Sequence, residues 1–192
     1  MSAASGDLAA LAARAASCTA CGLASTRTRV VFGAGRADAE LMFVGEGPGA
    51  EEDRRGEPFV GRAGTLLTQL IAGIDLTRDD VYIANVVKCR PPGNRNPAPG
   101  EIDACAPWLD GQLAAVEPTV IVTLGNFATR LLLGTREGIT RLRGRTFPVA
   151  RAGVEATVVP TYHPAAVLRS GGPMLAEVRA DFVAVKRLLA ER

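Results

Sequence analysis

The chain has 192 residues, of which 47% are hydrophobic and 22% charged, and its formal net charge is +2. A chain of this length and composition can bury a large core, so we expect a single domain over residues 1–192. The small net charge does not indicate a nucleic-acid partner, so polyanion binding would need local clusters of arginine and lysine. A basic signal-peptide start and an apolar run of about 18 residues are both missing, which predicts a cytoplasmic protein with no membrane partner.

Short apolar runs alternate with helical patterns along the chain. A first helix is predicted over 7–16, and runs typical of buried strands then occupy 41–44, 81–84, 120–124 and 156–159. Helical patterns occupy 63–71, 101–116, 127–133 and 175–189. This alternation predicts an α/β fold of three layers, α/β/α, around a central, mostly parallel four-stranded sheet.

The longest irregular stretch runs from Lys88 to Gly100. It holds four prolines and two glycines in thirteen residues, a composition that excludes a helix or a central strand. A loop of this length inside a compact domain is usually functional. We therefore expect it to serve a site.

Polar groups follow each predicted strand. They are the segment Gly45–Gly49, then Asn85, then Gly125-Asn126, and last His163, the only histidine. Ligands bind beyond the carboxyl ends of the strands in an open parallel sheet, because the loops there face one crevice. We therefore expect these groups to share one site.

The segment Gly45–Gly49 has the glycine density of a loop that cradles an anion. It lacks the Gly-Lys-Ser/Thr ending of a P-loop and the register of a dinucleotide fingerprint, which argues against a nucleoside triphosphate or NAD. A plain tight turn is the alternative interpretation.

Four cysteines form two pairs, Cys18 with Cys21 and Cys89 with Cys105. Structural disulfides are rare in a reducing cytoplasm, which favours metal or cluster ligation. Four thiolates suit either a structural zinc or a [4Fe–4S] cluster, and the spacing does not separate the two. Four unrelated buried cysteines are a further possibility, whereas a redox dithiol is disfavoured because no strand precedes Cys18.

Taken together, several motifs in one order resemble the family-4 uracil-DNA glycosylases, the iron–sulfur branch of that superfamily. The resemblance spans nearly the whole chain. Its motifs are Cys18-x-x-Cys21; Arg27-Thr-Arg-Val-Val-Phe-Gly33; Gly45-Glu-Gly-Pro-Gly49 followed by Glu51-Glu52-Asp53; Gly56-Glu-Pro-Phe-Val-Gly61; Asn85-Val-Val-Lys-Cys89-Arg-Pro-Pro92; and His163-Pro-Ala-Ala-Val-Leu-Arg169.

The resemblance implies a pocket for uracil flipped out of DNA. Phe59 would stack on the base, Asn85 would read its edge, and His163 would hydrogen-bond the oxygen at C2. The backbone of Gly45, Glu46 and Gly47 would touch the base. An asparagine amide offers one donor and one acceptor, which complement O4 and N3–H of uracil and mismatch the amino group of cytosine.

The resemblance also implies a reaction and a cofactor. Uracil leaves as an anion, which His163 and backbone N–H groups would stabilise, while Glu46 or Glu52 would orient the attacking water. The four cysteines would hold a structural [4Fe–4S] cluster, braced by the N-terminal segment and the 86–105 loop.

The expected partner is uracil-containing DNA, single- or double-stranded. The protein itself is expected to be a monomer. Leu168 and Arg169 match the family's intercalating loop, which fills the space that the flipped base leaves. Local positive charge for phosphate contact comes from Arg27, Arg29, Lys88, Arg90 and Arg95. A further cluster, Arg141, Arg143 and Arg145, is interpreted as ordinary solvated surface.

Three rival functions follow from the same residues. A related branch traps its product on a histidine in the loop after the second strand, but Pro91–Pro97 contains no histidine, so ordinary turnover is predicted. A non-catalytic uracil- or DNA-binding module, like the domains attached to some phage polymerases, is the second. A zinc-stabilised hydrolase acting on another base is the third.

Overall fold

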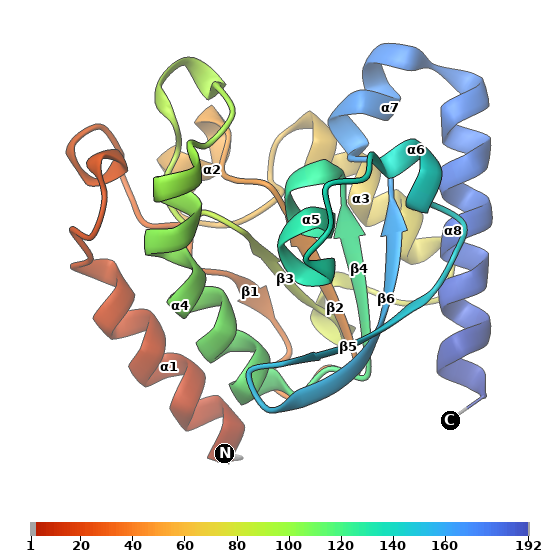
Figure 1. Cartoon of the computed structure of the whole chain (residues 1–192), viewed down its shortest axis with the longest axis horizontal. Helices are drawn as coiled ribbons and strands as arrows, with labels where there is room; N and C mark the ends of the chain where they lie inside the picture. The colour runs from red at the N-terminus through yellow and green to blue at the C-terminus, as the bar shows by residue number, and fades with distance from the viewer. Residues whose placement is uncertain (1–2, 192) are drawn as a thin grey trace.

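The structure is a computed structural model that describes residues 3–191. One six-stranded sheet, in the order β1-β3-β2-β4-β6-β5, forms its centre (Figure 1). The strands are β1 (Ala34–Gly35), β2 (Leu41–Gly45), β3 (Tyr82–Asn85), β4 (Val120–Leu124), β5 (Phe147–Arg151) and β6 (Val154–Thr161). The predicted α/β class is confirmed, and β2, β3, β4 and β6 are the four predicted strands, paired in parallel.

The predicted count of four strands was wrong, because two antiparallel edge strands complete the sheet. β1 is two residues long and pairs with β3, so it has no apolar run of its own. β5 alternates between half-buried and exposed residues and contains Pro148, which has no N–H to donate to a neighbouring strand. Both features are typical of sheet edges and give little signal in the sequence.

Helices cover both faces of the sheet. They are α1 (Ala3–Ala16), α2 (Ala50–Arg55), α3 (Arg62–Ala72), α4 (Pro99–Val116), α5 (Asn126–Leu133), α6 (Ile139–Leu142), α7 (Pro164–Ser170) and α8 (Gly172–Ala190), with 3₁₀ turns η1 (Gly22–Ser25), η2 (Arg78–Asp80) and η3 (Pro92–Asn94). The five predicted helices correspond to α1, α3, α4, α5 and α8.

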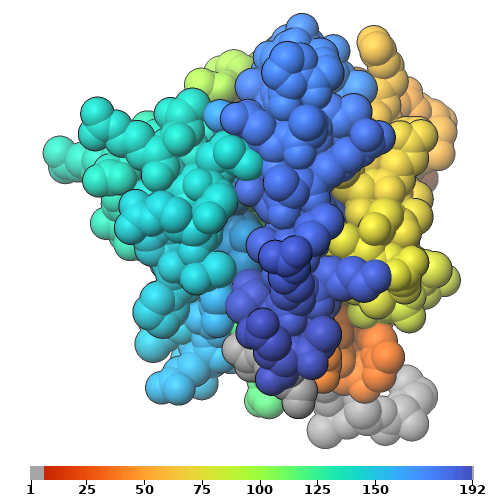
Figure 2. Space-filling model, turned by 90° about the vertical axis from the view of Figure 1, so that its right-hand side faces the viewer, coloured from red at the N-terminus to blue at the C-terminus, as the bar shows by residue number. Residues whose placement is uncertain are grey.

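Two apolar clusters separate the three layers. Residues of α1, α4 and α5 pack on one face, around Met42 and Ile121. Residues of α3, α7 and α8 pack on the other, around Phe43 and Val122. Figure 1 shows α1 and α4 side by side at one flank and α8 at the other, and Figure 2 shows α7 above α8, with α3 alongside. The division into domains stays a prediction.

The proline-rich stretch is shorter and more ordered than predicted. It contains the 3₁₀ turn η3, and α4 already begins at Pro99, whose missing N–H costs nothing at the first helical position. Its chain rises above α4 at the end of the sheet where the parallel strands finish (Figure 1).

The carboxyl ends of the parallel strands meet in register. Gly45 pairs with Asn85, and Leu124 pairs with Thr161, two residues before His163. The strand-end groups therefore share one edge of the sheet. Within residues 3–191, no helix is both long and apolar enough to cross a membrane.

Candidate functional site

A cavity of about 390 Å³ opens at this edge of the sheet. This volume lies within the range of small-molecule sites. Its walls come from four segments separated in the sequence. The lining residues are Glu46, Gly47, Pro48, Gly49, Glu52, Phe59, Ala63, Asn85, Pro91, Asn94, Arg95, Asn96, Pro97, His163, Ala165 and Arg169.

Phe59 forms one wall of the cavity, where its ring lies against two other predicted site residues. The ring centroids of Phe59 and His163 are 5.6 Å apart, at an interplanar angle of 31°. A Cβ atom on Gly45 would lie 2.6 Å from Phe59 Cζ and 2.4 Å from Asn85 Oδ1. Glycine at position 45 therefore lets the aromatic ring and the amide approach each other, although Gly45 itself is buried and is not among the residues that line the cavity.

Asn85 presents an unused acceptor to the cavity. The residue is 1% exposed, and its Oδ1 is the buried side-chain polar atom in residues 3–191 that has no hydrogen-bond partner. A buried acceptor of this kind costs on the order of 1–3 kcal/mol unless a ligand or water satisfies it. Its geometry therefore indicates a ligand that brings an N–H or O–H donor.

His163 lies where β6 gives way to α7, at the N-cap position of that helix. Its Nδ1 accepts a hydrogen bond from the backbone N–H of Ala165 at 3.1 Å. This bond assigns the proton of the neutral ring to Nε2. Burial lowers the pKa of His163 to about 4, with a smaller contribution from Arg169, so the ring is neutral at physiological pH and can still donate one hydrogen bond.

The two candidate carboxylates differ sharply in their surroundings. Glu52 Oε1 accepts the backbone N–H groups of Val60 and Gly61, both at 2.9 Å, and its Oε2 accepts that of Gly49 at 3.1 Å. Three backbone donors therefore occupy this carboxylate, which ties α2 to the segment after Phe59.

Glu46 is the freer carboxylate. Among the described residues no hydrogen bond to its side chain is found, and burial raises its pKa. Its backbone is fixed nonetheless, because its carbonyl accepts the N–H of Val87 at 3.1 Å. Glu46 thus places a half-buried, uncommitted carboxylate at the cavity wall.

The four cysteines line a second, smaller cavity. Cys18 and Cys21 enter it from the end of α1, while Cys89 and Cys105 come from the loop and from α4. In the described part of the chain, no group of three or more His, Cys, Asp or Glu side chains is close enough together to hold a metal ion. The predicted ligands therefore converge on one space without forming a closed centre.

N–H groups donate toward three of these sulfur atoms. Trp108 Nε1 lies 3.3 Å from Cys18 Sγ, Arg27 Nη1 lies 3.4 Å from Cys89 Sγ, and the backbone N of Lys88 lies 3.2 Å from Cys105 Sγ. Such donors are what thiolate ligands of a metal or cluster receive from the protein around them. The donor chemistry of this cavity therefore fits a four-cysteine centre.

Lys88 is not available for the predicted DNA contact. It is 1% exposed, and its Nζ donates to the backbone carbonyl of Asn85 at 2.7 Å and to Gln112 Oε1 at 2.5 Å. Burial lowers its pKa to about 7. Because lysine is usually exposed, a surface position was predicted for Lys88, and the Val-Val-Lys-Cys run does not indicate that this side chain is buried.

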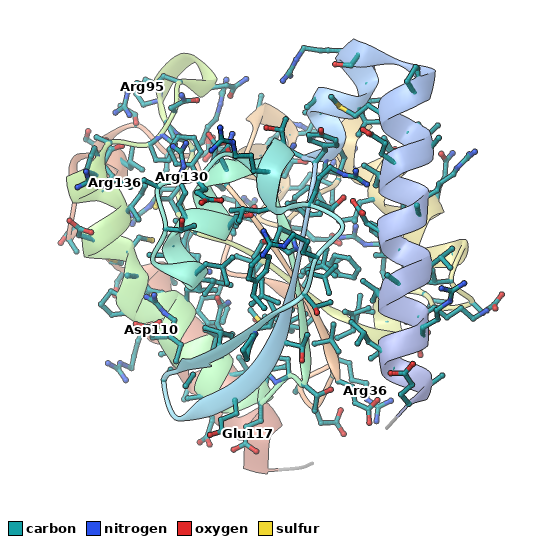
Figure 3. All side chains as sticks on the ribbon, turned by 45° about the vertical axis from the view of Figure 1, so that its right-hand side comes forward. Arg36, Arg95, Asp110, Glu117, Arg130 and Arg136 are labelled. Atoms are coloured by element: carbon teal, nitrogen blue, oxygen red, sulfur yellow. The ribbon has the colours of Figure 1, made fainter. Side chains whose placement is uncertain are left out.

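Two of the arginines predicted to contact DNA phosphates already have partners within the protein. Arg27 also donates to the carbonyl of Cys18 at 2.6 Å, and Arg95 pairs with Glu101 at 2.6 Å. Figure 3 shows Arg95 on the proline-rich loop above α4. Arg143, interpreted as solvated surface, instead forms an ion pair of 2.7 Å with Asp181, which is 3% exposed. That part of the interpretation was wrong.

The predicted DNA-contacting residues of the C-terminal region lie on α7, not on an irregular loop. Among the residues whose side chains the structure describes, Leu168 is one of two large apolar residues that are clearly exposed, at 44%. Arg169 lines the rim of the cavity. Arg90 is bound to Asn94 at 2.7 Å and lies outside the cavity lining. The structure thus gathers Arg169 with the pocket and leaves Leu168 beside it.

Sequence reasoning missed residues in two places. Asn94, Asn96 and Ala165 line the cavity without belonging to any predicted contact. Gln112 joins Lys88 to the carbonyl of Phe32 through a bond of 2.8 Å. A buried glutamine within an apolar helical face is the one signal that could have indicated such a network.

Comparison with known proteins agrees with this geometry. A sequence model of the uracil DNA glycosylase superfamily matches residues 32–184. The chain is 46% identical over 181 residues to the type-4 uracil-DNA glycosylase of Archaeoglobus fulgidus, covering 92% of this chain and 90% of the relative. Identity is 47% over 178 residues with the type-4 enzyme of Sulfurisphaera tokodaii (90% and 80% covered) and 49% over 158 residues with that of Thermotoga maritima (82% and 81%).

The fold and the strand-end cavity define an α/β protein with a polar pocket at the carboxyl ends of its parallel strands. The match to the family model and the identity to the relatives identify the family within this fold class. The chain belongs to the uracil-DNA glycosylase superfamily, in its type-4 branch.

Proposed function

We propose that this protein is a uracil-DNA glycosylase that takes uracil out of the DNA stack and hydrolyses its N-glycosidic bond. The products are free uracil and an abasic site, which begin base excision repair. The observation that carries the proposal is the buried, unpaired Oδ1 of Asn85 beside the ring of Phe59.

Recognition of uracil rests on Asn85 and Phe59. The N3–H of uracil supplies the donor that Asn85 Oδ1 lacks, and the amide group of the same side chain faces O4. Phe59 stacks on the base, and the backbone of Gly45–Gly47 carries the cavity floor. Cytosine has no hydrogen at N3, so it would leave the buried acceptor unpaired.

Cleavage of the bond requires stabilisation of the departing uracil anion. The Nε2–H of His163 donates to O2 of the base, where negative charge develops. Because the ring is neutral, with a pKa of about 4, it acts as a hydrogen-bond donor and does not transfer a full proton. One preorganised donor of this kind is worth about 3–4 kcal/mol of the activation barrier.

Glu46 is the carboxylate that orients the attacking water at C1′ of the sugar. Among residues 3–191 its side chain has no hydrogen-bond partner to give up, whereas the carboxylate of Glu52 is engaged by three backbone N–H groups. We therefore assign the water-orienting role to Glu46 and a positioning role to Glu52.

DNA contact lies at the mouth of the cavity. Leu168 enters the space that the flipped nucleotide leaves, and Arg169 and Arg90 contact phosphates beside it. One cavity in one chain completes the site, so the protein acts as a monomer. The expected substrate is uracil-containing DNA, single- or double-stranded.

The four cysteines hold a [4Fe–4S] cluster with a structural role. When bound, the cluster supplies a cross-link between the N-terminal segment and the 86–105 loop. Burial raises the pKa of Cys89 and raises that of Cys105 to about 11, which argues against a role of these two residues as free reactive thiolates. A bound metal centre offsets this effect, because it favours the deprotonated ligand.

The experiment is an excision assay on an oligonucleotide that carries one uracil. The expected result is free uracil together with an alkali-sensitive abasic site in the same strand. An oligonucleotide with thymine at that position is the matched control. Binding of the uracil oligonucleotide without release of base would contradict the proposal and favour a non-catalytic module.

A further inference from the structure

The backbone of Phe59 adopts a conformation that an aromatic residue rarely takes. Its φ angle is +53°, in the left-handed region that favours glycine. The side chain is nevertheless well buried, at 6% exposure, with its ring against Asn85 and His163. Such a conformation persists only where neighbouring groups hold it.

Arg78 holds this turn from the carbonyl side. Its Nη1 donates to the carbonyl oxygen of Phe59 at 3.0 Å, and its Nη2 donates to that of Pro58 at 2.8 Å. The two N–H groups of one rigid guanidinium therefore grip two successive carbonyls. A lysine cannot reproduce this arrangement, because its ammonium is a single point on a flexible stem.

The remaining contacts of the turn come from its other side. Glu52 accepts the N–H groups of the two residues after Phe59. Gly64 lies so close that a Cβ atom there would be 1.8 Å from the Phe59 carbonyl oxygen. The turn is thus fixed between α2, α3 and the guanidinium of Arg78.

The location of Arg78 links the turn to the base-reading strand. The residue begins η2, which leads directly into β3, and β3 ends at Asn85. One short segment of chain therefore carries both the group that holds the stacking ring and the group that reads the base edge. A shift of Arg78 would change the distance between them.

We propose that Arg78 is a positioning residue for the base, which acts by holding Phe59 in the left-handed conformation that presents its ring to the cavity. The inference rests on the proposed function, since it assigns to Phe59 the stacking of uracil. Arg78 touches neither the base nor the reacting atoms. Its effect therefore passes through the aromatic ring.

The test uses Arg78→Met, which keeps the apolar stem but removes both donors, and Arg78→Lys. Two ligands separate the roles: free uracil, which needs the stacking ring, and DNA with a tetrahydrofuran abasic analogue, which has no base. For Arg78→Met we expect the inhibition constant of free uracil to rise about tenfold or more, because small misplacements of a binding group are costly. Affinity for the abasic analogue stays within twofold, and Arg78→Lys is intermediate.

Two control variants isolate the carbonyl contacts. Glu57→Gln removes the 3.6 Å ion pair of Arg78 with Glu57 but leaves the carbonyl contacts, so uracil inhibition should not change. Arg151→Met removes a guanidinium of similar exposure, 24% against 22%, that bridges β5 to Asp110. Figure 3 places Asp110 on the α4 flank, below the loop of Arg95, and neither Arg151 nor Asp110 lines the cavity. This variant reports the effect of lost stability alone.

A double variant decides whether Arg78 acts through Phe59. In a Phe59→Ala background, Arg78→Met should weaken uracil inhibition no further, although the melting temperature still falls. An equal loss in Arg78→Met and Arg151→Met, or an additive loss in the double variant, would overturn the inference. If the wild-type protein releases no uracil, the proposed function fails instead, and the two failures are thereby distinguished.

Discussion

The 86–105 segment contributes residues to the walls of two cavities, and these walls differ in their chemistry. The strand-end cavity is lined by polar groups with unused capacity, above all Asn85 Oδ1 and the carboxylate of Glu46. The cysteine cavity is lined by the four thiols, by small apolar residues and by Arg27, Lys88 and Trp108, and N–H groups of these last three donate to three of the sulfur atoms. The first arrangement suits a ligand that enters and leaves, whereas the second suits a group that stays.

Lys88 connects the two cavities physically. Its backbone N–H faces Cys105 Sγ, and its Nζ holds the carbonyl of Asn85. A change at the cysteine end can therefore reach the base-reading residue through one buried side chain. The comparison predicts that damage at the cysteines disturbs both cavities, whereas damage at the base pocket leaves the cysteines intact.

The largest effect is expected from Cys105→Ser, which removes one of the four proposed cluster ligands. The variant should lose the visible absorbance of the cluster, and the midpoint of thermal unfolding should fall by on the order of 10 °C, as expected for a few kcal/mol of lost stability. Excision should fall with it. A protein that keeps its absorbance and its melting point would show that Cys105 is not a ligand.

Asn85→Ala should lower kcat/KM for uracil excision by about 10²–10³-fold, because recognition of the base edge is lost. The visible absorbance should stay unchanged, since the backbone carbonyl that Lys88 holds is still present. Steady-state kinetics and an absorption spectrum on the same sample check both statements. Loss of the cluster in this variant would break the distinction between the two cavities.

The pH dependence of stability tests the environment of His163. Its pKa falls from 6.5 to about 4 on folding, so between these values the unfolded chain binds a proton that the folded protein does not. The contribution is therefore complete above pH 6.5 and is lost as the pH falls toward 4, by on the order of 3 kcal/mol. Urea unfolding at several pH values should show this slope in the wild type and less of it in His163→Asn.

A pair of carboxylate variants separates Glu46 from Glu52. Glu46→Gln should lower kcat by about ten- to a hundredfold with little change in melting temperature, since a positioned general base typically contributes at least this much. Glu52→Gln should lower the melting temperature, because it weakens the bonds to Val60 and Gly61. The reverse pattern would exchange the two roles.

The smallest effect is expected from Leu168→Ala. The side chain is 44% exposed, so stability should change little. Excision from double-stranded DNA should slow severalfold, while excision from single-stranded DNA should slow less, because only the duplex must be kept open. Equal slowing on both substrates would argue against a wedge.

Much of the fold could be predicted from the sequence because its central strands are buried on both faces. Runs such as Val120–Leu124 are buried throughout and apolar except for Thr123, and the helices between them show a helical period. The edges could not be predicted in this way. β5 owes its place to hairpin pairing with β6 across a two-residue turn, and neither its half-buried alternation nor Pro148 indicates a strand on its own.

The site was predictable where a motif carried it, and its supporting contacts were not. Phe59, Asn85 and His163 come from separate motifs and lie around one cavity, while their proposed roles stay predictions. The burial of Lys88 depends on the hydrogen-bond acceptor that Gln112 supplies from α4, twenty-four positions away in the sequence. The Arg78 contacts likewise depend on tertiary packing, which no local pattern records.

The most direct measurement compares base release from three oligonucleotides that differ only in carrying uracil, cytosine or thymine at one position. If Asn85 and Phe59 form a uracil pocket, free base should appear from the uracil strand alone. Release of cytosine at a comparable rate, or of no base from any strand, would contradict the central claim that this cavity recognises uracil.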